Sequence, residues 1–343
     1  MLEKFNKKAR NKISNIKNRV FPGAIILMYH RVAEVDSDPW SLCVKPKHFA
    51  EHLEVLQKYG NLIHLQRLKQ RIDHRETIHR SIVVTFDDGY ADNFYNAKPL
   101  LEKYDVPATV FITTGGIDQK QEFWWDELDR LLLQPGTLPD LFQLNINNQI
   151  HQWELGEATS YSKEAFERDQ SWRMECSEDP TPRHALYRYL YQQLQFLPVY
   201  ERKKCLDKIC VWAKAEPIGR LTHRSLSHQE IFELESGGLI EIGSHTVNHP
   251  FLSDIPIDSQ QTEIKQSKHS LEQLLGHSIT SFSYPNGSYG IETPSIVKEA
   301  GFNCACCSIA NPVKKNSNNF LLPRFVVEDW DGETFARWLS RYF

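Results

Sequence analysis

The chain has 343 residues, of which 41% are hydrophobic and 24% charged, with a formal net charge of -4 at pH 7. This length and composition allow a sizeable core, either in one large domain with an insertion or in two modest domains. The net charge gives no argument for a nucleic-acid partner, and the seven Cys lack the spacing of a disulfide framework.

The first twenty residues are basic, with seven Lys or Arg and no continuous apolar stretch. They do not have the pattern of a secretory signal, so we expect a cytoplasmic protein. Ile13, Ile16 and Val20 could form an apolar stripe on a basic helix that contacts anionic lipid, which would make the protein membrane-peripheral. A solvated basic tail is the competing interpretation. Residues 24–29 are apolar but far too few to span a bilayer.

Residues 46–60 predict an amphipathic helix that Gly60 terminates. His48 and His52 stand four residues apart in it, and Glu51 completes the His-x-x-Glu-His pattern of inverted zincin peptidases. The apolar residues of this segment recur at ordinary helical spacing. We therefore interpret it as a core-facing helix rather than a metal site.

Short apolar runs then alternate with helical patterns along much of the chain. Strands are expected at 24–30, 81–87, 108–114, 239–245, 281–285, 304–309 and near 324–328, and helices at 91–104, 227–235 and 259–275. This alternation predicts a parallel sheet. The expected fold class is α/β, a distorted or incomplete (β/α) barrel of about seven parallel strands with a mostly helical insertion. Cys304, Cys306 and Cys307 lie in one apolar run and predict buried, reduced thiols.

The insertion is expected where the alternation stops, between residues 118 and 224. It begins with a helical pattern at 122–133 and becomes helical again at 187–213, so it is too long and too apolar for a loop. Trp124 and Trp125 could stack on a sugar ring or anchor the insertion. The expected division is a basic N-terminal segment (1–23), a barrel domain (24–117 and 225–343) and the insertion (118–224).

Two of the expected strands end in residues that can bind a metal ion. Asp87 and Asp88 follow the apolar run 81–86, and His245 and His249 follow the run that begins at Leu239. Active sites of α/β folds collect at the carboxyl ends of the strands. Asp and neutral His are suitable ligands for zinc, and a catalytic site uses three protein ligands so that one position stays open.

The base of such a site must come from outside the His pair. Pro250 disfavours helix at His249, so the pair lies in a loop, and Thr246 stands where a zincin helix carries its Glu. Asp87 or Asp88 could be the base, while the other carboxylate completes the metal ligands.

Residues 85–89 and 245–249 together resemble the first two signature motifs of the polysaccharide deacetylases, the carbohydrate esterases with a NodB homology domain. The resemblance covers roughly residues 24 to 117 and 225 to 335. It implies that Asp87 is the general base and that one divalent metal ion is held by Asp88, His245 and His249. Zinc is the first candidate, and cobalt, nickel, manganese and iron stay open because Asp and two His accommodate several ions.

The segment 282–287 resembles the third motif of this family. The resemblance implies a substrate-binding and oxyanion role for Tyr284, Pro285 and Asn286, with the backbone N–H of Asn286 binding the oxyanion. The Arg that usually stands in this motif is replaced here by Ser283 or Tyr284. We predict that Arg324 supplies the guanidinium from another strand.

A further departure concerns the catalytic acid. The late leucine-x-histidine motif is absent, since no His follows His277. His30 ends the first expected strand, which resembles the permuted arrangement of relatives that deacetylate poly-N-acetylglucosamine. We predict that His30 is the acid; a neutral His of the core is the alternative.

These roles imply a metal-dependent hydrolase that removes acetyl groups from N-acetylated sugars, using a metal-activated water, an Asp base and a His acid. The implied partner is an N-acetylated glycan or a glycan precursor used in surface-polysaccharide biosynthesis. Two alternatives remain open: a related hydrolase of another C–N amide or of an O-acetyl ester, and a non-catalytic carbohydrate-binding protein of the same fold.

Overall fold

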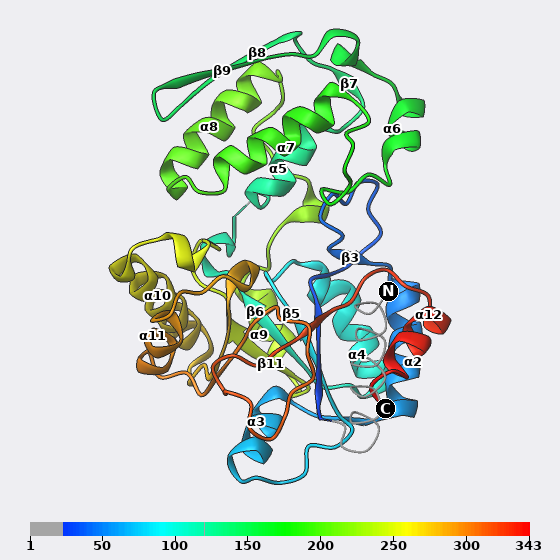
Figure 1. Ribbon diagram of the computed structural model, residues 1–343, viewed down its shortest axis with the longest axis vertical. Coiled ribbons are helices and arrows are strands. Elements are labelled where there is room, and N and C mark those ends of the chain that lie inside the picture. Colours follow the sequence, from blue (N-terminus) through cyan, green and yellow to red (C-terminus); the bar gives the residue numbers. More distant parts are fainter. Residues whose placement is uncertain (1–22, 120) are drawn as a thin grey trace, which may run out of the picture. The chain divides into compact units, whose positions relative to one another are not determined.

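The computed structural model describes residues 23–119 and 121–343 (Figure 1). The expectations for the basic segment, including its lipid-facing stripe, therefore fall outside the described residues. The described residues form two compact units, one of residues 23–34, Cys43–Gly115 and His228–Phe343, the other of Val35–Leu42 and Gly116–Ser227. Within the described ranges, no helix has both the length and the apolar character needed to cross a membrane.

The first unit is built on an eight-stranded parallel sheet. In sheet order the strands are β13 (Cys304–Cys306), β12 (Ser281–Ser283), β11 (Ile240–Ser244), β6 (Ala108–Ile112), β5 (Ser81–Phe86), β1 (Ile25–Tyr29) and β14 (Phe325–Val326), with β4 (Asn61–Leu62) beside the start of β5. Every residue of β1, β5 and β6 is buried. Continuous apolar runs of this kind are typical of parallel strands covered on both faces.

The sheet remains open, because no pairing between β13 and β14 occurs in the described part of the chain. The predicted fold class, an incomplete barrel of about seven parallel strands, is thus confirmed. The short β4 was not predicted. A separate parallel pair joins β2 (Arg31–Val32) to β3 (Cys43–Val44). Cys304, Cys306 and Cys307 are buried and free, as predicted.

Helices surround this sheet. They are α2 (Pro46–Tyr59), α3 (Leu65–Asp73), α4 (Lys98–Tyr104), preceded by a π-helical segment (Asn93–Ala97), α9 (His228–Glu235), α10 (Ile257–Leu275), α11 (Thr293–Glu299) and α12 (Gly332–Leu339). Figure 1 shows α10 beside α11, and α2 beside α12. Leu65, Leu68 and Ile72 of α3 pack with Val83 and Phe111 of the sheet. The apolar face of α3 thereby contributes to the core of this unit.

Helix α2 carries the His48 and His52 pair, and both imidazoles contact other protein groups. His52 is fully buried; its Nε2 donates to the Trp330 carbonyl at 2.7 Å, and its Nδ1 accepts from the Tyr29 hydroxyl at 3.2 Å. Burial lowers the pKa of His52 to about 4. His48 Nδ1 lies 2.7 Å from Asp329 Oδ1. This helix therefore has the packing role that its apolar pattern indicates.

The second unit contains α5 (Trp124–Leu132), α6 (Lys163–Asp169), α7 (Pro182–Leu194) and α8 (Val199–Trp212), with two strand pairs, β7 (Gly136–Thr137) with β10 (Ser160–Tyr161) and β8 (Leu141–Ile146) with β9 (Gln149–Glu154). The helical patterns are observed, whereas the β8–β9 hairpin was not predicted. Trp125 is buried, and Trp124 stacks on Tyr191 with the Arg202 guanidinium over its ring. The structure therefore favours the anchoring role of both Trp residues.

Candidate metal centre

The two motifs that follow strands β5 and β11 lie close together in the first unit. Strands β5 and β11 lie on either side of β6, so the residues that follow them share one end of the sheet. The carboxylate of Asp88 and the imidazoles of His245 and His249 each place one ligand atom within 4.8 Å of the others. Asp88 and His245 are buried, and His249 is nearly so.

The separations between these atoms fit a bound divalent ion. Asp88 Oδ1 lies 3.5 Å from His245 Nε2 and 3.3 Å from His249 Nε2. Ligand bonds of about 2.0–2.2 Å in a tetrahedron separate neighbouring ligand atoms by about 3.4 Å. Asp88 Oδ1 is also buried without a hydrogen-bond partner, which is costly for a carboxylate oxygen unless another group satisfies it.

The orientation of His245 is set by a backbone carbonyl. Its Nδ1 lies 2.9 Å from the Ser283 oxygen. Because a carbonyl can only accept, Nδ1 carries the proton and the Nε2 lone pair points toward Asp88. Burial lowers the pKa of His249, which favours the neutral imidazole. The Nδ1 hydrogen bond of His245 and the neutral form of His249 both suit metal binding through Nε2.

Asp87 lies next to these ligands and is clamped by Arg324. The guanidinium donates to both carboxylate oxygens, with Nη1 to Oδ1 and Nη2 to Oδ2 each at 2.7 Å. Arg324 is fully buried, and its Nη1 and Nη2 also donate to the hydroxyls of Thr85 and Ser283. Burial alone would raise the pKa of Asp87, but the charge of Arg324 and its hydrogen bonds to both oxygens outweigh it and hold this pKa below its usual value. Asp87 is therefore an ionised carboxylate at neutral pH.

Several residues of this end of the sheet have left-handed backbone conformations. Asp88 has φ 74°, Thr246 has φ 65°, His249 has φ 55° and Asn286 has φ 54°. Non-glycine residues occupy this region uncommonly and at a free-energy cost, and such residues concentrate at functional sites. Their grouping at the end of the sheet that carries the ligands agrees with a functional site there.

His30 and the third-motif residues are placed as follows. His30 directly follows β1, and Asp87 directly follows β5; Tyr29 and Phe86, the last residues of these strands, are partners in the parallel pair, so His30 and Asp87 leave the same end of the sheet. The Tyr284 side chain is fully buried and its hydroxyl donates to the Phe320 carbonyl at 2.9 Å. Its backbone N–H donates to the Cys306 carbonyl and its own carbonyl accepts from the Gly287 N–H, so the structure gives no support for the predicted substrate contact of Tyr284. Pro285 is buried, whereas Asn286 is exposed in the turn that follows β12.

Ser283 is a contributor that sequence reasoning missed as a site residue. Its carbonyl accepts from His245, and its hydroxyl donates to Asp87 Oδ2 at 3.1 Å while accepting from Arg324 at 2.7 Å. It therefore connects the ligand His to the clamped carboxylate. The only sequence signal was that a small hydroxyl residue stands in the third motif where Arg is usual.

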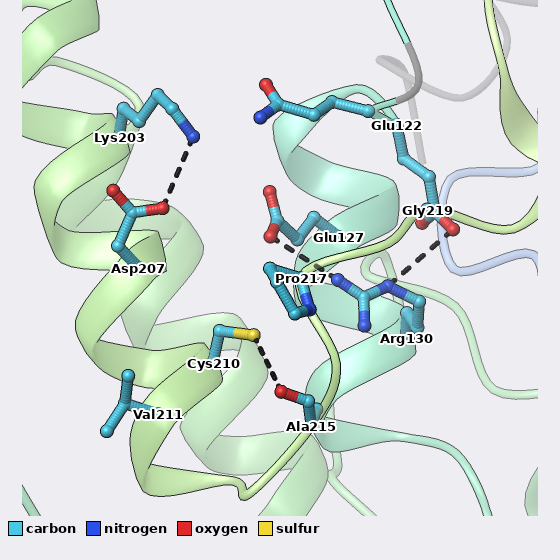
Figure 2. Close-up of a pocket in the computed structure, with 11 residues that line it drawn as sticks. Glu122, Glu127, Arg130, Lys203, Asp207, Cys210, Val211, Ala215, Pro217 and Gly219 are labelled. Atoms are coloured by element: carbon cyan, nitrogen blue, oxygen red, sulfur yellow. Dashed lines mark hydrogen bonds and ion pairs between the residues drawn. The ribbon is translucent and has the colours of Figure 1, made fainter.

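A hollow of about 290 Å³ lies in the second unit and is lined by residues of α5, α8 and the segments 121–122 and 215–219 (Figure 2). Lys203 Nζ donates to Asp207 at 3.2 Å and Arg130 Nη2 to Glu127 at 3.4 Å. The Cys210 thiol donates to the Ala215 carbonyl. Each of these charged groups is thus paired within its own helix, so the hollow offers no argument for an active site.

Comparison with known proteins identifies the class to which this fold and site belong. Residues 74–191 and 209–305, more than half of the chain, match the family model described as polysaccharide deacetylase. The chain therefore belongs to the polysaccharide deacetylase family, as the motifs indicated. YxkH of Bacillus subtilis (strain 168), whose given name places it in this family, is 30% identical over 108 residues, which are 31% of this chain and 37% of YxkH.

Solved structures agree on the fold. The Streptococcus pyogenes deacetylase PplD, in complex with acetate, superposes with a TM-score of 0.56 at 18% identity, covering 92% of this chain and 98% of PplD. IcaB from Ammonifex degensii superposes with a TM-score of 0.56 at 17% identity, covering 92% of this chain and 97% of IcaB. At these identities the likeness establishes the shared fold. The permuted arrangement around His30 stays a prediction.

Proposed function

We propose that this protein is a metal-dependent hydrolase that removes acetyl groups from N-acetylated sugars of a polysaccharide or its precursor. Family membership supports deacetylation of a polysaccharide. The observation that carries the finer proposal is the ionised carboxylate of Asp87, which Arg324 clamps beside a set of three metal-binding side chains. A free carboxylate in this position is the group that such a hydrolysis needs as its base.

Asp88, His245 and His249 would hold the ion. A bound divalent ion supplies Lewis acidity, which polarises the acetyl carbonyl and lowers the pKa of an attacking water. Zinc suits an Asp and two neutral His, and cobalt, nickel, manganese and iron suit the same donors. The buried and unpartnered Asp88 Oδ1 supports an ion at this position.

Asp87 would accept the proton of the attacking water. Its Oδ2 lies 4.0 Å from His245 Nε2, so a water beside the ligands is within its reach. Each carboxylate oxygen has two lone pairs. Oδ2 accepts from both Arg324 and Ser283, whereas Oδ1 accepts one bond from Arg324, so the remaining acceptor capacity of the carboxylate is on Oδ1. Arg324 fixes the orientation of this carboxylate and keeps it ionised.

His30 would then act as the acid. As an imidazolium it would donate its proton to the leaving amine as the C–N bond breaks, so that the products are acetate and a free amino sugar. Its place directly after β1, whose last residue is paired with the residue before Asp87, supports a position beside the reacting groups. The backbone N–H of Asn286 would donate to the oxyanion.

The test is acetate release from N-acetylglucosamine oligomers, precursor glycans and O-acetylated glycans, with and without a metal chelator. We expect release from an N-acetylated glycan that the chelator abolishes and added zinc restores. Release from the O-acetylated glycans alone would identify an esterase instead. Glycan binding without release from any substrate would identify a carbohydrate-binding protein.

A further inference from the structure

The loop that carries the two His ligands has a conformation that it would not adopt by itself. Between His245 and His249 the chain turns so that both Nε2 atoms face Asp88, and Thr246 and His249 have left-handed φ angles of 65° and 55°. A β-branched residue such as Thr is a rare occupant of this region. A strained turn of this kind persists only where surrounding groups impose it.

The strongest of these surrounding groups is the carboxylate of Glu263, in helix α10. Its Oε2 accepts from the backbone N–H groups of Val247 at 2.9 Å and Asn248 at 2.8 Å. Its Oε1 accepts from the Asn248 side-chain amide at 2.7 Å. Hydrogen bonds to an ionised acceptor are roughly twice as strong as neutral ones. Three of them therefore converge on the middle of the loop from one side chain.

Backbone contacts hold the same loop from the other side. The N–H groups of Thr114 and Gly115 donate to the carbonyls of Thr246 and Val247 at 3.1 and 2.8 Å. A Cβ at Gly115 would lie only 2.6 Å from the Val247 oxygen, so this approach requires glycine. Thr246 adds a bond from its own side chain, since its hydroxyl accepts from the His249 N–H at 3.1 Å.

Helix α10 is itself attached to the strand that leads into the loop. The hydroxyls of Ser267, in α10, and Ser244, the last residue of β11, are 2.7 Å apart and both residues are fully buried. Glu263 stands one helical turn before Ser267 in the chain. Its carboxylate is therefore presented to the loop from an element that is fixed relative to β11.

We propose that Glu263 is a positioning residue of the metal centre, which sets metal affinity by holding the His245–His249 loop in its strained conformation. The inference rests on the proposed function in one respect, that the centre binds a metal ion. Glu263 is not itself one of the ligand groups. Removing a residue that orients metal ligands typically lowers metal affinity by roughly 10–100-fold.

The test is the zinc affinity of the full chain, measured by competition with a chromophoric chelator. Glu263→Ala removes all three hydrogen bonds and is expected to weaken zinc binding by about 10–100-fold. Glu263→Gln keeps an uncharged acceptor and is expected to restore part of the loss. Glu272→Ala is the matched control, because Glu272 is also in α10 and bonds the Ile279 N–H and Lys268, away from the loop.

The outcomes separate this inference from the proposed function. Zinc binding by the wild type with unchanged affinity in Glu263→Ala would overturn the positioning role and leave the proposed function standing. An equal loss in Glu272→Ala would also overturn it, because the effect would then belong to the helix as a whole. A wild-type chain that binds no zinc, cobalt, nickel, manganese or iron would overturn both. If Glu263→Ala does not fold, the comparison of Glu263→Gln with the wild type and Glu272→Ala decides the question.

Discussion

Replacing Arg324 by Met is the change that most sharply tests the buried pair beside the ligands. Arg324 has no exposed surface and Asp87 is 3% exposed, so water cannot replace the lost cation. Breaking a buried pair by removing one partner typically destabilises a protein by about 3–5 kcal/mol, because an uncompensated charge remains. We expect Arg324→Met to lower the free energy of unfolding of the first unit by about this amount.

The assay is urea unfolding of a double-mutant cycle with Asp87→Asn. Because Asn carries no charge, Arg324→Met should cost less in the Asp87→Asn background, with a coupling energy of about 1–3 kcal/mol. Arg183→Met is the control. Arg183 is also buried, but its guanidinium donates to five backbone carbonyls of the second unit, so its effect should add to that of Asp87→Asn within about 0.5 kcal/mol. A loss below about 1 kcal/mol in Arg324→Met, or zero coupling with Asp87→Asn, would refute the reasoning.

Three other predictions concern His residues. His30→Ala should lower the rate of deacetylation with bound metal retained, and a pH–rate profile identical to that of the wild type would place His30 outside the chemistry. His48→Ala should leave the metal content, measured by elemental analysis, unchanged, because the His48 imidazole contacts the Asp329 carboxylate instead of the metal centre. A loss of metal would contradict the ligand set. His52 should make the first unit acid-sensitive: its pKa is about 4 when folded and near 6.5 when unfolded, so the unfolded chain binds the extra proton between these values. The free energy of unfolding should therefore fall by up to about 3 kcal/mol as the pH falls through this range. If a His52→Gln variant showed the same pH dependence of unfolding, another group would be responsible.

The sheet and the ligand cluster were accessible from the sequence because they depend on local patterns. Buried parallel strands such as β5 and β11 are short apolar runs, and the rule that strand carboxyl ends converge is sufficient to bring Asp88, His245 and His249 together. The family resemblance added the assignment of Asp87 as the base. Arg324 was predicted only as a candidate, because no local pattern indicates that a side chain just before β14 reaches the end of β5.

The features that sequence reasoning missed have two different causes. Ser283 and Glu263 act through hydrogen bonds to distant segments, and no periodic pattern encodes such contacts. The β8–β9 hairpin, in contrast, has a local signal: residues 141–146 alternate between exposed and buried, and Asn147 and Asn148 both have positive φ, as a tight hairpin turn requires. The strong helical patterns on either side of it obscured that signal.

The metal content of purified protein, measured together with acetate release from N-acetylated glycans, tests the central claim most directly when three chains are compared. The wild type should carry one divalent ion and release acetate, Asp87→Asn should carry the ion without releasing acetate, and Asp88→Ala should lack both. Full activity in Asp87→Asn would contradict the assignment of the base. Metal retained at wild-type level in Asp88→Ala would contradict the ligand set on which the whole mechanism depends.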